Sequence, residues 1–396
     1  MAAKQAAEKL ISSHKVAVFS KTYCPYCSKT KSTLQGLNVP NVGILELDTE
    51  SNGSDIQAYL KDKTGQNSVP NVFINGKHIG GNSDLQELHS KGELQKLIAA
   101  PFPSHPTITT TSYTDSLPKY IAYGDSYLNN NSFGVPDPNA LRGFTHYNIA
   151  FWTSTDGGSD NVAEWIKASV TQRKAIVKAY NDAGIRLGMA LFGETNAPLS
   201  NGEDPQKLAN KIANFVKKYN LQGVDVDFEE YDAFEQKRAT KWLIPFTRQL
   251  RANLPKEQYY LSHAPIAPLF NTDSYPLGYT WVQQRIGDLI DFYNIQFYNQ
   301  DDYSTCHTLL VESKGEWPNT ALIQLNEVYG IPFEKMIVGK PAREQDADNG
   351  YIDPHKLAVC LANFAVPTGW KSGCMWWEYT GDLQRVLVPV KELAGL

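Results

Sequence analysis

The chain has 396 residues, 42% of them hydrophobic, and its 37 basic and 42 acidic residues give a net charge of −5. This length exceeds what one compact domain usually holds, and the apolar fraction excludes disordered and collagen-like classes. The sequence has no cluster of Lys and Arg, which argues against a nucleic-acid partner. No apolar run approaches the roughly 20 residues of a membrane span, so we expect no membrane partner either.

The composition changes near Ser104. Residues 1–104 contain eleven Lys, no Arg and no Trp, whereas all eight Trp and every Arg follow. Residues 99–119 carry four Pro among Ser and Thr, a composition typical of a semi-extended linker. We therefore predict a first domain over residues 1–104, a linker over 105–118 and a second domain over 119–396.

The first domain alternates helix and strand patterns. After an amphipathic amino-terminal helix come a strand ending at Ser20, a helix opening at Cys24, a strand over 43–49 and a helix from about Ser54. Alternating apolar residues on both sides of Asn75-Gly76 predict a hairpin over 71–80, followed by a last helix from Asn82. The pattern predicts a small α/β sheet between helices.

The second domain shows eight strand-like runs, most of them separated by amphipathic helical stretches. Eight alternations in about 280 residues are typical of a (β/α)8 barrel, although a doubly wound open sheet has the same rhythm. The runs are KYIAYG, HYNIAFW, RLGMALFG, GVDVDFE, YYLSHAP, FYNIQFY, MIVGKPA and GCMWWEY.

Two cysteines form a C-x-x-C motif directly after the first strand. Cys24 lies where a helix begins, so unpaired N–H groups and the helix dipole favour its thiolate, and Cys27 is one turn away. This arrangement predicts a nucleophilic Cys24 and a resolving Cys27. A structural pair or half of a zinc site is the alternative, but a zinc site needs two further ligands at matching spacing.

The segments KTYCPYC and GQNSVPNVFINGKHIGGNSDL resemble the dithiol glutaredoxins over nearly all of residues 1–104. The resemblance implies a thioredoxin-like fold and glutathione as co-substrate, with disulfide or glutathionylated proteins as partners. Pro70 would be a cis proline facing the thiols, and Ser83 and Asp84 would cap a helix as well as receive glutathione. The implied glutathione-binding residues are Lys21, Tyr26, Gln66, Val69, Pro70, Asn82, Ser83 and Asp84.

Three acids alternate with apolar residues in LQGVDVDFEE, residues 221–230. On a strand, Asp225, Asp227 and Glu229 share one face, which in a barrel is the inner face at the carboxyl end of the fourth strand. Three stacked carboxyl groups do not all ionise cheaply, so at least one should keep a proton near neutral pH, as a general acid requires. A solvated acidic edge strand and a divalent-cation site are the alternatives.

GVDVDFE, together with DFYNIQFYN and GCMWWEY, resembles the family 18 glycoside hydrolases, the chitinases and endo-β-N-acetylglucosaminidases. The resemblance implies that Glu229 is the acid and base, that Asp227 orients the substrate's acetamido group and that Asp225 shares a proton with Asp227. Catalysis would be substrate-assisted, with the acetamido oxygen attacking the anomeric carbon. Tyr298 completes the implied catalytic set, and the implied substrate-binding residues are Gln296, Trp377, Tyr123, Phe151 and Asn299.

The sequence departs from this family at two places. Gln222 replaces the first Asp of the pattern, and Ala190-Leu191-Phe192-Gly193 replaces the third-strand S-x-G-G. Both positions mainly brace the site, and the acid Glu229 is present. A non-hydrolytic oligosaccharide-binding barrel with an active or carrier glutaredoxin, and an artificial or misjoined fusion, are the alternative interpretations.

The remaining cysteines and histidines form no motif. We expect Cys360 and Cys374 to be free core thiols, make no assignment for Cys306 and predict no metal. Five Cys with one C-x-x-C pair are typical of a reducing compartment. The amino terminus lacks the features of a secretory signal, so we expect a cytoplasmic location.

Overall fold

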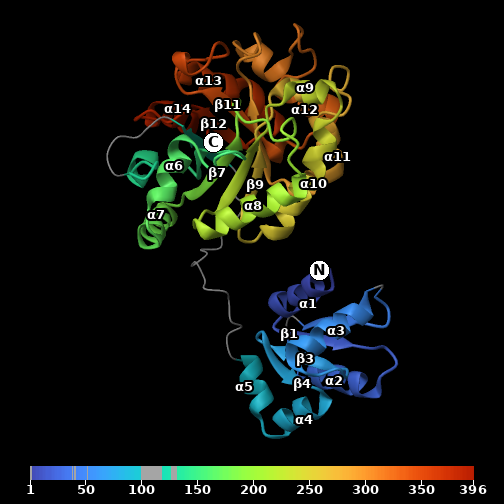
Figure 1. Cartoon of the computed structure of the whole chain (residues 1–396). Helices are drawn as coiled ribbons and strands as arrows, with labels where there is room; N and C mark the ends of the chain where they lie inside the picture. The colour runs from blue at the N-terminus through green and yellow to red at the C-terminus, as the bar shows by residue number, and fades with distance from the viewer. Residues whose placement is uncertain (1, 38, 40–41, 51, 100–117, 126–131) are drawn as a thin grey trace. The chain divides into compact units, whose positions relative to one another are not determined.

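The computed structural model describes residues 2–37, 39, 42–50, 52–99, 118–125 and 132–396 (Figure 1). The chain divides into two compact units, Met1–Tyr113 and Thr114–Leu396. The predicted boundary at Ser104 and nearly all of the predicted linker, 105–117, lie outside the described residues, so the exact domain limits stay a prediction.

The first unit is a four-stranded mixed sheet between helices. Strands β1 (Val16–Ser20), β2 (Val42–Glu46), β3 (Asn71–Ile74) and β4 (Lys77–Gly80) have the order β2-β1-β3-β4. β2 runs parallel to β1, while β3 runs antiparallel to both β1 and β4. This is the predicted thioredoxin-like sheet. Its helices are α1 (Ala2–Ser13), α2 (Pro25–Gly36), α3 (Gly53–Thr64), α4 (Asn82–Ser90) and α5 (Glu93–Ala99).

Alternation along β1 builds a core on each face of this sheet. Ala17 and Phe19 face a cluster that contains residues of α1 and α3. Val16 and Val18 face a second cluster, with residues of α2, α4 and α5. The predicted last helix is split into two, because Gly92 adopts a left-handed φ of 68° after α4 ends.

The second unit is a closed barrel of eight parallel strands, in the order β10-β11-β12-β5-β6-β7-β8-β9 (Figure 1). The pairing of β12 with β5 closes it, which excludes the open doubly wound sheet. All eight predicted runs are strands. They are β5 (Lys119–Gly124), β6 (His146–Trp152), β7 (Arg186–Phe192), β8 (Gly223–Asp227), β9 (Tyr260–His263), β10 (Phe292–Gln296), β11 (Met336–Pro341) and β12 (Gly373–Trp377).

Helices surround this barrel, and the main core lies between the two layers (Figure 1). In the described residues they are α6 (Asp160–Lys167), α7 (Val170–Asp182), α8 (Pro205–Lys218), α9 (Tyr231–Glu235), α10 (Ala239–Asn253), α11 (Tyr279–Ile286), α12 (Leu322–Tyr329), α13 (Pro354–Cys360) and α14 (Gln384–Leu393). No helix of the described part is long and apolar enough to span a bilayer.

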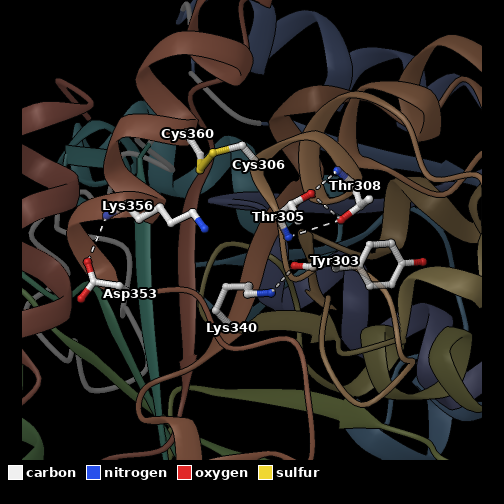
Figure 2. The surroundings of a disulfide bond; sticks show 8 residues. All are labelled: Tyr303, Thr305, Cys306, Thr308, Lys340, Asp353, Lys356 and Cys360. Carbon is white, nitrogen blue, oxygen red and sulfur yellow. Dashed lines mark hydrogen bonds between the residues drawn. A yellow bond between two sulfur atoms is a disulfide. The ribbon is translucent and has the colours of Figure 1, made fainter.

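A disulfide joins Cys306, at the end of the loop after β10, to Cys360 at the end of α13 (Figure 2). The expectation that Cys360 is a free core thiol is therefore wrong. The two cysteines are 54 residues apart in the sequence, a spacing that carries no local signal, and the barrel brings their Cα atoms to 5.1 Å. Cys374 is a free, buried thiol as expected.

Candidate functional sites

The first site is the dithiol pair at the start of α2. Cys24 is the residue before the helix and is partly exposed, whereas Cys27 lies one turn later and is fully buried. Burial acts to raise the pKa of Cys24, but the backbone N–H of Cys27, the Cys27 thiol, the N–H of Tyr26 and the charge of Lys21 outweigh it and lower that pKa. Burial raises the pKa of Cys27. Of the two thiols, Cys24 is therefore the one whose thiolate is favoured, and its role as the nucleophile stays a prediction.

The loop before β3 faces this thiol. The Val69–Pro70 peptide is cis, as predicted, and the Cys24 thiol donates to the Val69 carbonyl at 3.7 Å. The side-chain amide of Gln66 donates to the carbonyls of Ser68 and Pro70, at 3.0 and 2.9 Å. In this structure Gln66 therefore supports the loop that presents Val69.

The other predicted glutathione residues are spread around the same loop and α4. Tyr26 is 62% exposed beside the thiols. Asp84 accepts from the N–H of Gly81 at 2.7 Å, so its predicted capping role is present, and Ser83 is exposed beside it. Asn82 differs, because its buried side-chain oxygen already accepts from Thr30 at 3.1 Å. The side-chain oxygen of Asn82 thus ties α4 to α2.

The second site is a ladder of carboxyl groups in the barrel. Val224, Val226 and Phe228 belong to the outer core, so the acids between them point into the barrel, as their alternation predicts. Asp225 is fully buried, Asp227 is 5% exposed and Glu229 is partly exposed. The ladder therefore leads from the barrel interior to its carboxyl-end opening, with the predicted acid outermost.

Asp225, the innermost acid, is surrounded by donors. The hydroxyl groups of Tyr123 and Ser262 each donate to it at 2.6 Å, and the Asn294 amide donates at 3.0 Å. Burial raises the pKa of Asp225, while these three bonds oppose the shift. The three donors favour the carboxylate form of Asp225 and so reduce the effect of burial on its pKa.

The two outer acids, Asp227 and Glu229, lie in surroundings that favour the protonated form of a carboxyl group. Burial and the charges of Glu229 and Asp225 raise the pKa of Asp227 far above its ordinary value. Burial also raises the pKa of Glu229, although bonds from Tyr231 and Asp227 oppose it. The amide of Gln296 donates to Asp227 at 2.9 Å and reaches Glu229 at 3.5 Å. Both outer acids therefore favour their protonated forms, and Asp227 does so more strongly.

Aromatic side chains line the barrel opening. The rings of Phe151 and Trp377 are stacked with centroids 5.7 Å apart, and Tyr123 lies 6.0 Å from Trp377. Tyr298 is 5% exposed in the same inner cluster, and the charges of Asp227 and Glu229 act on its hydroxyl group. A flat indole and phenyl surface beside carboxyl groups suits the apolar face of a sugar ring.

The structure separates some predicted binding residues from the opening. Tyr123 is 2% exposed and its hydroxyl group is bonded to Asp225, so it supports the ladder from below. The side-chain oxygen of Asn299 accepts from the N–H of Asp348 at 2.8 Å, which ties one loop to the next. Trp376 is buried core, as expected. The binding roles predicted for Tyr123 and Asn299 stay predictions.

Three residues of this site were missed from the sequence: Ser262, Asn294 and Tyr231. Asn294 alternates with Gln296 on β10, which was a usable signal, whereas Ser262 is a lone small polar residue on β9. Ser262 pairs with Asp225 on one side, and Ala190 pairs with it on the other. Ser262 thus supplies a hydroxyl donor to Asp225 from the fifth strand of the barrel, whereas Ala190 on the third strand has none.

The second departure, Gln222, lies at the other end of β8 from Glu229. Its side-chain oxygen accepts from the N–H of Leu187 at 2.9 Å, and its amide donates to Asn181 at 2.8 Å. Gln222 thus braces the start of the strand. Among the described residues, no group of three or more His, Cys, Asp or Glu is arranged to hold a metal ion; the prediction of no metal stays a prediction.

Comparisons with known proteins agree with this division. The Glutaredoxin family model matches residues 16–79, and the model described as Glycosyl hydrolases family 18 matches residues 119–375. Glutaredoxin-1 of Rhizophagus irregularis is 55% identical over 97 residues, which are 24% of this chain and 95% of the relative. Glutaredoxin-1 of Saccharomyces cerevisiae is 52% identical over 92 residues, 22% of this chain and 84% of the relative.

A solved structure matches the barrel. The family 18 chitinase from Pseudoalteromonas aurantia is 25% identical, with a TM-score of 0.56 over 70% of this chain and 99% of the chitinase.

Proposed function

The chain belongs to family 18 of the glycosyl hydrolases through its barrel and to the glutaredoxins through its first unit, and from this we propose that it carries two activities. The barrel hydrolyses β-1,4 bonds of N-acetylglucosamine in chitin-like oligosaccharides or glycans. The first unit reduces disulfides and glutathionylated proteins with glutathione. The carboxylate ladder of Asp225, Asp227 and Glu229 is the observation that carries the first proposal.

The proposed glycosidase step follows from the order of the ladder. Glu229, outermost and with a raised pKa, protonates the glycosidic oxygen, and the substrate's acetamido oxygen attacks the anomeric carbon. Asp227 carries a proton and lies beside the charged Asp225, with which it shares that proton. It also orients the acetamido N–H of the substrate. Tyr298 and Gln296 orient the same group. Glu229 then takes a proton from a water molecule that attacks the anomeric carbon and displaces the acetamido oxygen, and this second inversion restores the β configuration.

A single substitution tests this assignment. We expect Glu229→Gln to lower hydrolysis of tetra-N-acetylchitotetraose by about a hundredfold or more, while oligosaccharide binding is retained. Product analysis by chromatography, with a high-mannose glycopeptide as a second substrate, measures cleavage and separates chitinase from endoglycosidase activity.

Glu194→Gln is the matched control, because Glu194 is exposed and its charge only raises the pKa of Glu229. This variant should keep hydrolysis and move the upper limb of the pH profile to lower pH. Binding without cleavage by the wild type would instead identify the barrel as an oligosaccharide-binding module.

The proposed thiol reaction uses both cysteines of the first unit. The Cys24 thiolate attacks the substrate disulfide and forms a mixed disulfide, which Cys27 or glutathione resolves. Cys24→Ser should abolish glutathione-dependent disulfide reduction, whereas Cys27→Ser should keep part of the deglutathionylation activity because glutathione can replace the resolving thiol. Cys374→Ser, a buried thiol of the barrel, is the control and should change neither rate. Equal loss in Cys24→Ser and Cys27→Ser would contradict these roles.

A further inference from the structure

Lys340 on β11 is a buried amine that the proposed chemistry does not use. Lys340 is 1% exposed, and burial lowers the pKa of its amine from 10.5 to about 7. The ion pairs of the described residues do not include it. Its Nζ donates instead to two backbone carbonyls, those of Phe297 at 2.6 Å and Tyr303 at 3.1 Å. Figure 2 shows the side chain directed at the Tyr303 backbone, beside the Cys306–Cys360 disulfide.

The packing of β11 does not require an amine at this position. Met336 and Val338 lie on the same outer face of β11 and pack as ordinary core residues, while Ile337 faces the barrel interior. A buried amine without a counterion is costly, and hydrogen bonds to carbonyls offset only part of that cost. We therefore attribute the burial of an amine here to its hydrogen bonds with the loop after β10.

That loop needs external support. Three non-glycine residues in it, Asn299, Asp301 and Tyr303, have φ angles of 64°, 55° and 62°. Left-handed backbone at such residues is unfavourable and persists only where surrounding bonds determine it. The neighbouring loop supplies some of these bonds, because Asn349 accepts from the N–H of Asp301 at 3.0 Å and donates to its carboxylate at 3.0 Å.

The two bonds from Lys340 lie on either side of Tyr298 in the chain. Phe297 immediately precedes Tyr298, and Tyr303 ends the left-handed segment that follows it. Tyr298 is the residue of this loop that packs in the inner cluster of the barrel, together with Tyr123, whose hydroxyl group donates to Asp225 of the carboxylate ladder. Movement of this loop would therefore move the Tyr298 hydroxyl relative to the acids.

We propose that Lys340 is a positioning residue for Tyr298: its ammonium group binds the carbonyls of Phe297 and Tyr303 and so fixes the loop that places the Tyr298 hydroxyl beside the carboxylate ladder. This inference rests on the proposed glycosidase function. Lys340 makes no contact with substrate and acts through the loop alone.

A double-mutant cycle tests the proposal. Lys340→Met keeps the length of the side chain and removes its donors. We expect it to lower kcat by about tenfold with a smaller change in KM, and to cost less than about threefold when Tyr298 is already replaced by Phe. The matched control is Val338→Ala, on the same face of the same strand. It should lower the melting temperature, and any effect on kcat should be the same with Tyr298 or Phe.

Two further measurements keep the test independent of hydrolysis. Amide hydrogen exchange over residues 297–303 should be faster in Lys340→Met and unchanged in Val338→Ala, because only the first variant loses the two loop bonds. Lys340→Gln, which retains an N–H donor, should fall between wild type and Lys340→Met, and it replaces the methionine variant if that protein does not fold.

The outcomes separate the two claims. If the wild type does not cleave, the glycosidase proposal fails, and the loop is judged by exchange and by the affinity for tetra-N-acetylchitotetraose, which should fall in Lys340→Met. The positioning role would be wrong if Lys340→Met lowered kcat equally in the wild-type and Tyr298→Phe backgrounds. It would also be wrong if Lys340→Met left amide exchange over residues 297–303 unchanged.

Discussion

Asp225 and Asp227 lie on the same face of β8, but their partners give them different charges. Asp225 accepts bonds from Tyr123, Ser262 and Asn294, all of which favour a carboxylate. Asp227 lies between Asp225 and Glu229, whose charges and the surrounding burial raise its pKa. We infer that the proton stays on Asp227 and the charge on Asp225.

This difference predicts how Asp227 affects stability. Its ordinary pKa of 3.8 applies to the unfolded chain, and its pKa in the folded chain is far higher. The unfolded chain therefore loses this proton first, so stability is full below about pH 4 and falls as the pH rises toward the folded pKa. Asp227→Asn does not titrate and should raise the free energy of unfolding at pH 7 by about 1 kcal/mol or more, while abolishing activity.

Thermal unfolding of wild type and Asp227→Asn at pH 4 and pH 7 measures this effect. The control is Asp225→Asn, which should destabilise the barrel at pH 7, because an amide group would face the donors that now bind the carboxylate. If Asp227→Asn lost stability equally at both pH values, the raised pKa of Asp227 would be wrong.

Among the elements, the loop between β10 and the disulfide is held at several points. Lys340 binds its beginning and end, Asn349 binds its middle, and Cys306 joins the end of the loop to α13 through Cys360. The disulfide closes a stretch of 54 residues that includes β11. Such a cross-link reduces the freedom of the unfolded chain and thereby favours the folded state.

Removal of this disulfide should destabilise the barrel. We expect the double variant Cys306→Ser/Cys360→Ser to lower the free energy of unfolding by about 2 to 4 kcal/mol, as is typical for loops of this length. Denaturant unfolding followed by tryptophan fluorescence measures it, because all eight Trp belong to the second unit. Cys374→Ala, a change at a buried free thiol, is the control: it keeps the disulfide and should be destabilised by added reductant as the wild type is, whereas the double variant should not respond to reductant.

A wild-type barrel that unfolds at the same denaturant concentration with and without reductant would contradict this expectation. The location of the protein in the cell stays a prediction.

Strands and helix starts were predictable because their signals are local. Strand-like runs between helical stretches identified all eight barrel strands, period-two alternation identified the inward face of β8, and Asn75-Gly76 identified the hairpin between β3 and β4. The contacts between loops were not predictable. The bonds from Lys340 to Phe297 and from Asn349 to Asp301 join residues 43 and 48 positions apart, with no pattern linking them.

At the scale of the whole molecule, each unit has its own core. The first unit buries two clusters on its sheet, and the second buries a large cluster between strands and helices and a small one inside the barrel. This agrees with the change in composition near Ser104. Two separately packed cores can fold and work independently, which is why we assign each activity to its own unit.

The sequence by itself identified both candidate sites. The C-x-x-C motif and the alternation of Asp225, Asp227 and Glu229 are local patterns, and strand or helix geometry alone places such residues on one face or at one helix end. Only the tertiary structure decided which groups surround them. Closure of the barrel brings Tyr123, Ser262 and Asn294 to Asp225 from three other strands, and it sets Lys340 beneath the Tyr298 loop. The physical reason is that hydrogen bonds and burial, which set charge and position, depend on neighbours that chain order does not specify.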